Sequence, residues 1–87
     1  MTNRVEQSAA QIWTEVLKPG FGEEGHSFFA LSGQSVSAMR IVARLESELG
    51  IEFDISVLFD DPDRDTFVRT VAAAAAAAAD DGASHAA

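Results

Sequence analysis

Hydrophobic residues recur at helical spacing in three stretches of the chain. In the first, between about residues 4 and 18, they stand three or four positions apart and predict one buried face of a helix: Val5, Ala9, Ile12, Trp13, Val16 and Leu17. Asn3 can cap this helix, and Glu6 can complete a capping box. Lys18-Pro19-Gly20 predicts its end, because proline disfavours the helical conformation in the residue before it.

The second stretch begins at Ser35 or Val36 and continues to about Leu49, where Gly50 supplies a stop. Its inward stripe consists of Ala38, Ile41, Val42, Leu45 and Leu49. This pattern predicts a second helix that follows a long loop over residues 19–34.

The loop carries two distinct signals. Residues 20–27 approach the phosphate-binding pattern G-x-x-x-x-G-K-S, but a histidine replaces the lysine, two glutamates are present and no strand precedes it. We interpret this part as a solvated connector with Phe21 as a candidate apolar anchor. Phe28, Phe29 and Leu31 are too apolar for a free loop, so at least two of them should pack on the core.

After Gly50 the pattern changes to alternation, with Ile51, Phe53 and Ile55 on one side. Five residues without a partner strand cannot form a sheet, so we expect an extended connector that buries these three side chains. Ser56–Phe59 predicts a short helix, which Asp60-Asp61-Pro62 ends.

The third periodic stretch starts after Asp63, a good cap, and should bury Phe67, Val68 and Val71. Eight alanines, residues 72–79, continue this helix at little cost because alanine has the best helix propensity. Gly82 should terminate it. The prediction is therefore an all-α, four-helix bundle, with one domain over residues 1–79 and a flexible tail over 80–87.

The composition of the chain excludes several classes of partner and of chemistry. The 87 residues include fourteen acidic and six basic side chains, and a net charge of -8 repels nucleic acid. No cysteine is present, which excludes disulfides, thiolate metal sites and a protein thiol. No apolar run reaches about 20 residues and no signal sequence is evident. We therefore expect a cytoplasmic monomer with no metal and no membrane contact.

Ser35, where the loop meets the second helix, invites three interpretations. The sequence Gly33-Gln34-Ser35-Val36-Ser37 approaches a hydrolase nucleophile elbow, but that chemistry needs a preceding strand, a histidine and an acid, and only His26 and His85 are present. Ser35 could instead cap the helix through its hydroxyl. It could also be an attachment point, since a helix start stabilises a phosphodiester by roughly 0.3–1 kcal/mol.

Residues 28–36, Phe-Phe-Ala-Leu-Ser-Gly-Gln-Ser-Val, resemble the F-F-x-L-G-G-[HDQ]-S-[LIV] signature of peptidyl carrier proteins, the thiolation domains of nonribosomal peptide synthetases. The resemblance extends over about residues 4–72 and implies an acyl-carrier-like bundle. It also implies that a phosphopantetheinyl transferase attaches 4'-phosphopantetheine covalently to Ser35, using coenzyme A and magnesium. The cofactor thiol would then hold an aminoacyl or peptidyl group as a thioester.

The same resemblance implies a carrier without catalytic residues of its own, serving natural-product (antibiotic) biosynthesis. Its partners would be the transferase, an adenylation enzyme or domain, and condensation or tailoring enzymes. We expect Val36, Met39, Arg40 and Phe59 to form the recognition surface, although the first three could equally be the plain flank of the helix. Because the chain starts with methionine and holds one domain, we expect a stand-alone carrier.

Two positions depart from the family pattern. Ser32 replaces a glycine, and His26 replaces an aspartate that usually precedes the two phenylalanines. Either change could alter the loop and narrow the choice of partners. Fatty-acid and polyketide acyl carriers are the alternative, but they typically have aspartate before the serine and an acidic second helix, where this chain has Gln34, Arg40 and Arg44.

Overall fold

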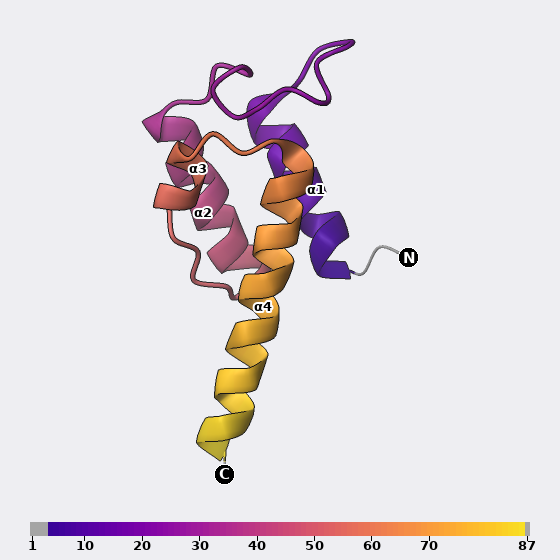
Figure 1. The fold of residues 1–87 in the computed structure, drawn as a ribbon. Coiled ribbons are helices and arrows are strands. Elements are labelled where there is room, and N and C mark those ends of the chain that lie inside the picture. The colour runs from indigo at the N-terminus through magenta and orange to yellow at the C-terminus, as the bar shows by residue number, and fades with distance from the viewer. Residues whose placement is uncertain (1–3, 87) are drawn as a thin grey trace.

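The computed structural model describes residues 4–86, with side chains described for residues 4–78. Within this part of the chain there are four helices and no strand: α1 (Arg4–Leu17), α2 (Ser35–Leu49), α3 (Ser56–Phe59) and α4 (Arg64–Ala86). α1 packs against both α2 and α4, and the long loop joins α1 to α2 across one end of the bundle (Figure 1). The predicted fold class, helix order and long loop are confirmed.

The helix ends follow the predicted chemistry. α1 stops before Lys18, whose φ of 49° is left-handed and whose amide donates to the Thr14 carbonyl at 2.8 Å. α2 stops at Gly50, which has a φ of 65° and whose amide donates a hydrogen bond to the Glu46 carbonyl at 3.0 Å. Asn3, the predicted cap of α1, lies outside the described residues.

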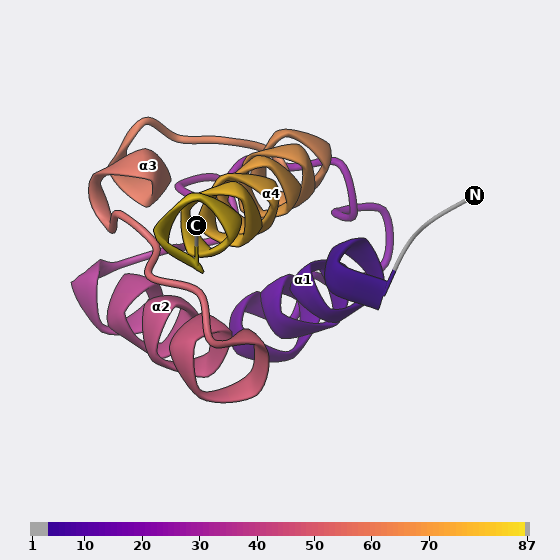
Figure 2. The same ribbon diagram turned by 90° about the horizontal axis from the view of Figure 1, so that it is seen from below.

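The core is centred on Trp13, which is completely buried. Its ring lies 6.3 Å from the ring of Phe28 in the loop and 5.1 Å from that of Phe67 in α4. Phe67 in turn meets Phe53 edge-on at 5.7 Å. Four segments that are distant in sequence therefore converge on one aromatic cluster. Figure 2 shows how α1, α2 and α4 are arranged around the middle of the bundle.

The segment between α2 and α4 also folds as predicted. Ile51 and Phe53 are buried, and Ile55 packs partly against the core. At the start of α4, Asp63 accepts the Thr66 amide at 2.8 Å, which confirms its capping role. Together with the burial of Phe67, these contacts fix the direction in which α4 returns along α1.

α4 is longer than the sequence predicted. The helix passes Gly82, the expected stop, and continues to Ala86, so its last turns extend beyond the other helices (Figure 1). A single glycine costs a helix only about 1 kcal/mol relative to alanine, and the alanine run before it favours continuation. The expected end at Gly82 was therefore wrong, whereas the division of the chain at residue 79 stays a prediction.

Candidate functional site

Ser35 is the first residue of α2 and its side chain is exposed. The N-cap position belongs to Gln34, whose backbone is extended (φ -136°) and whose carbonyl accepts the Ala38 amide at 2.9 Å. No side-chain capping bond is made there, and the Ser35 hydroxyl bonds to no other described residue. The capping interpretation of Ser35 was therefore wrong, because the helix already begins at Ser35 and leaves the hydroxyl free.

The turn before Ser35 is a Schellman motif. The Ser32 amide donates to the Phe29 carbonyl at 3.0 Å, and the Gly33 amide donates to the Phe28 carbonyl at 2.8 Å. Ser32 adopts a φ of 64°, in the left-handed region that favours glycine. The replacement of glycine at this position therefore leaves the turn itself in place.

Gly33 is required for a different reason. A Cβ atom at this position would lie 2.6 Å from the Phe28 carbonyl oxygen and 2.7 Å from its ring. The chain can thus pass this closely over Phe28 only without a side chain. Since Phe28 is completely buried, the turn is fixed directly to the core two residues before Ser35.

The prediction that at least two apolar residues anchor the loop is confirmed, because Phe28 and Leu31 are buried. Phe29 faces outward instead and is 48% exposed. Sequence reasoning did not predict Phe29 as a surface residue of the loop before Ser35. Its position follows from packing: once Phe28 points into the core, its neighbour in a tight turn points away from the core.

The start of α2 suits a phosphate. The helix has 15 residues and no acidic side chain in its first turn. The first amides of a helix have no intrahelical acceptor, and the helix dipole places partial positive charge there. An exposed hydroxyl at this end can therefore carry a phosphodiester without an acidic side chain from the same helical turn beside it, which fits a phosphopantetheine group.

The predicted recognition residues lie at the surface. Val36 is 52% exposed, Met39 54% and Phe59 42%, and Arg40 is also exposed. α3, which carries Phe59, lies on the same side of the bundle as the start of α2 in both views (Figures 1 and 2). We call the exposed apolar side chains of this region the apolar rim, namely Phe29, Val36, Met39 and Phe59. Arg40 is an exposed charged residue of the same α2 segment.

The two arginines of α2 differ in role. Arg44 donates to Glu15 of α1 and to Glu48 of α2, each at 2.6 Å. The hydrogen bonds from Gln11 and from Arg44 lower the pKa of Glu15. Arg44 thus ties α1 to α2, whereas the Arg40 side chain bonds to no other described residue.

The glycine-rich part of the loop is held by hydrogen bonds between its own residues. The Gly20 amide donates to the Glu23 carboxylate at 2.7 Å, and the Glu23 amide donates to the Gly20 carbonyl at 3.0 Å. Gly22 has a φ of 84° between them, as in a tight turn. Phe21 is fully exposed at the tip, so its interpretation as an anchor was wrong.

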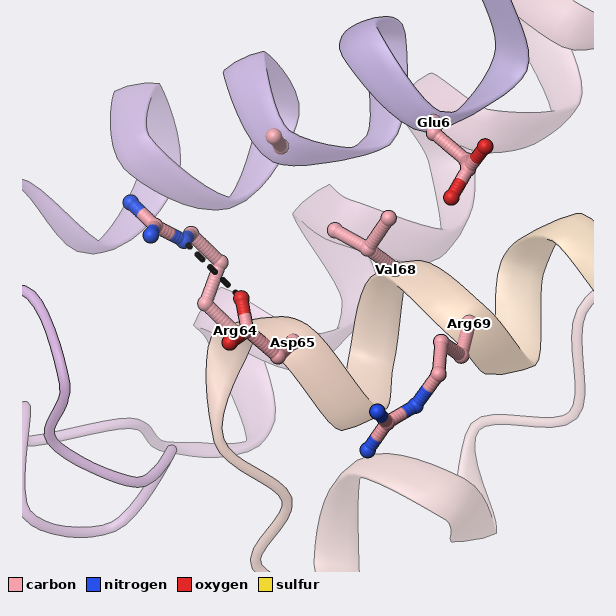
Figure 3. A pocket seen from close by; sticks show the side chains of 6 residues that line it. Glu6, Arg64, Asp65, Val68 and Arg69 are labelled. Atoms are coloured by element: carbon pink, nitrogen blue, oxygen red, sulfur yellow. Dashed lines mark ion pairs between the residues drawn. The ribbon is translucent and has the colours of Figure 1, made fainter. Parts of the chain in front are cut away.

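A separate hollow of about 320 Å³ lies between α1 and α4 (Figure 3). It is lined by Glu6, Ala10, Arg64, Asp65, Val68 and Arg69. Arg64 and Asp65 face each other there at 3.8 Å. Neither Ser35 nor any residue of the apolar rim lines this hollow.

Catalytic partners for Ser35 are not found. No strand precedes it in residues 4–34, and His26 is exposed in the loop without a hydrogen bond to Ser35. His85 lies outside the described side chains. No group of three acidic or histidine residues within the described part could hold a metal ion. Among the residues with described side chains, the structure places no histidine in hydrogen-bond contact with the exposed Ser35 hydroxyl, an interaction that a serine hydrolase needs.

Comparison with known proteins identifies the family. The family model described as a phosphopantetheine attachment site matches residues 7–71. Among the relatives, surfactin synthase subunit 3 of Bacillus subtilis (strain 168) is 44% identical over 62 residues, which is 69% of this chain and 5% of that protein. Gramicidin S synthase 2 of Brevibacillus brevis is 35% identical over 63 residues, 70% of this chain and 1% of that protein.

Phosphinothricin tripeptide synthetase PhsC of Streptomyces viridochromogenes is 35% identical over 69 residues, 79% of this chain and 6% of that protein. The chain thus spans only about one to six per cent of the length of these three relatives. It belongs to the phosphopantetheine attachment-site family, as a carrier domain of the peptidyl (thiolation) type. In this family the cofactor is attached covalently to a serine. None of the described helices is long and apolar enough to cross a membrane.

Proposed function

We propose that Ser35 is the serine that carries 4'-phosphopantetheine, and that the chain presents an aminoacyl or peptidyl group to partner enzymes of nonribosomal peptide synthesis. The observation that supports this most is the position of the hydroxyl, exposed at the first residue of α2 and free of hydrogen bonds within the described residues. The nearest other serines in sequence are Ser32 and Ser37. Ser32 lies in the turn before α2, and Ser37 lies two residues after Ser35 within α2. Neither combines a helix start with the family signature.

The role of Ser35 is that of a nucleophile which another enzyme activates. Its Oγ attacks the pyrophosphate of coenzyme A, the new O–P bond replaces the bond to adenosine 3',5'-bisphosphate, and the hydroxyl proton passes to a base of the transferase. The amides and the dipole at the start of α2 then stabilise the phosphodiester on Ser35. When bound, the cofactor supplies the thiol that holds the carried group as a thioester.

The chain itself is not an enzyme under this proposal. Its residues bind, expose and orient the arm, and the chemistry takes place on a transferase, an adenylation enzyme or domain, and condensation or tailoring enzymes. The peptide synthetases among the relatives and the residues Gln34 and Arg40 favour a peptidyl over a fatty-acid or polyketide cargo.

The attachment is tested by intact mass after incubation with coenzyme A, magnesium and a promiscuous phosphopantetheinyl transferase. The wild type should gain one phosphopantetheine, Ser35→Ala should gain none, and the matched control Ser37→Ala should be modified as the wild type is. A wild type that stays unmodified, or a Ser35→Ala variant that is still modified, would refute the assignment. The cofactor-bearing protein is then incubated with adenylation enzymes and, separately, with acyl transferases. Loading by the first class indicates an aminoacyl cargo, and loading by the second indicates an acyl cargo.

The apolar rim is tested separately. Met39→Ala should weaken loading by partner enzymes while the melting temperature stays nearly unchanged, because a side chain that is 54% exposed contributes little to the core. The same is expected of Val36→Ala. A large fall in melting temperature for either variant would show that the residue belongs to the core.

A further inference from the structure

One pair of hydrogen bonds joins the turn after α3 to the loop before Ser35. The Phe29 amide donates to Asp61 Oδ1 at 2.8 Å, although these residues are 32 positions apart. The adjacent Phe28 amide donates to the Pro62 carbonyl, also at 2.8 Å. Two consecutive residues of the loop are thus held by two consecutive residues of the α3–α4 turn.

Asp61 has the conformation that this contact needs. Its φ is 61°, a left-handed value that aspartate and asparagine tolerate better than most residues. Its own amide donates to the Leu58 carbonyl at 3.2 Å and so closes the end of α3. The neighbouring Asp60 is exposed, and its side chain bonds to no other described residue.

The bond matters most for Phe29. Phe28 is held independently, because its ring is completely buried against Trp13. Phe29 is half exposed, and its ring lies 5.6 Å from the Phe28 ring. Its carbonyl accepts the Ser32 amide within the loop, whereas its amide is held from outside the loop by the Asp61 carboxylate. The Asp61 bond therefore ties the Phe29 backbone to the α3–α4 turn.

We propose that Asp61 is a positioning residue for cofactor transfer. By holding the Phe29 amide, it keeps the loop before Ser35 and the α3 surface with Phe59 in one arrangement, which the transferase recognises. This inference rests on the proposed attachment at Ser35. The sequence predicted that Asp61 helps to end the short helix, and its bond to Phe29 adds a contact to the loop before Ser35.

Loss of the bond should act on binding more than on chemistry. If the loop is in the recognised arrangement for only a fraction of the time, the apparent affinity is the intrinsic affinity multiplied by that fraction. The saturated complex reacts as before. One hydrogen bond of ordinary net strength corresponds to a change of roughly two- to tenfold. We therefore expect KM of the carrier for the transferase to rise within this range while kcat stays nearly constant.

Three variants of the full chain separate the explanations. Asp61→Gly removes the carboxylate and suits the left-handed backbone. Asp61→Asn removes the charge but keeps an oxygen acceptor and also tolerates this backbone. Asp60→Gly is the matched control for adding a glycine and losing a charge one residue away. For each, transfer kinetics with coenzyme A and hydrogen exchange of the Phe29 amide by NMR are measured, with exchange of the Ile41 amide in α2 as an internal reference for global stability.

Asp61→Gly should raise KM and speed exchange at Phe29 by roughly two- to tenfold, with Ile41 exchange little changed, while Asp61→Asn and Asp60→Gly should resemble the wild type. A wild-type KM and wild-type Phe29 exchange in Asp61→Gly would overturn the proposal and leave the attachment at Ser35 standing. An equal defect in Asp61→Asn would overturn it in favour of a direct charge contact. Failure of the wild type to gain any cofactor would instead remove the attachment and this inference together.

Discussion

Ser32→Gly should stabilise the protein, since Ser32 is a non-glycine residue in a left-handed conformation, three residues before Ser35. Its φ of 64° places it at the position of the Schellman turn that glycine usually occupies. An L-residue pays about 1–2 kcal/mol for this conformation. Glycine loses about 0.5–1 kcal/mol through its greater freedom in the unfolded chain.

These two opposing effects leave a gain of about 0–1.5 kcal/mol in the free energy of unfolding, with a midpoint of about 0.75 kcal/mol. No hydrogen bond is lost, because the Ser32 side chain is exposed and bonds to no other described residue. For a domain of this size, 1 kcal/mol shifts the melting temperature by about 4–8 °C, so the midpoint corresponds to a rise of about 3–6 °C.

Thermal and urea unfolding followed by circular dichroism measure this change. Ser32→Ala is the control, because it removes the hydroxyl but keeps the left-handed strain, and it should not gain stability. An equal gain in Ser32→Ala would place the effect in the hydroxyl. No gain in Ser32→Gly would show that the turn is not strained, and the reasoning would then be refuted. Cofactor transfer to Ser32→Gly should proceed as in the wild type, because the turn already has its glycine-like shape.

Three further outcomes are expected. Gly33→Ala should destabilise the fold by about 1–3 kcal/mol, because its Cβ would meet the Phe28 carbonyl oxygen at 2.6 Å, and urea unfolding measures this loss. Phe67→Ala should cost about 3–5 kcal/mol and leave little folded protein at 37 °C by circular dichroism. The bond from the Thr66 amide lowers the pKa of Asp63, so its contribution is present above about pH 4 and is lost as the pH falls below that. Asp63→Asn keeps a cap but cannot titrate, and its melting temperature should fall less between pH 5 and pH 3; a parallel fall would contradict the cap.

The helices and the core were predictable from the sequence because their signals are local. Periodic apolar residues predicted α1, α2 and the buried face of α4, and Asp63 and Gly50 predicted where helices begin and end. The length of α4 was not predictable from a single glycine, because the preference of one residue competes with the alanine run before it. Local preference is a weak guide where two such preferences oppose each other.

The details around Ser35 were harder to predict, because they depend on contacts between distant residues. The sequence located Ser35, but the identity of the capping residue depends on the backbone of Gln34. The outward position of Phe29 follows from the burial of Phe28 against Trp13. No periodic pattern contains this information, since it arises only when α1 and the loop pack together.

The contacts that stabilise the segment around Ser35 and the side chains proposed for partner recognition involve different atoms. Backbone bonds from Phe28 and Phe29 to the α3–α4 turn hold the loop, and the close passage of Gly33 over Phe28 fixes its end. The side chains of Met39 and the rest of the apolar rim remain exposed and contribute little to the core. Because the backbone is held without them, these side chains can change without moving the Ser35 hydroxyl, which under the proposed function would let the surface suit a different partner.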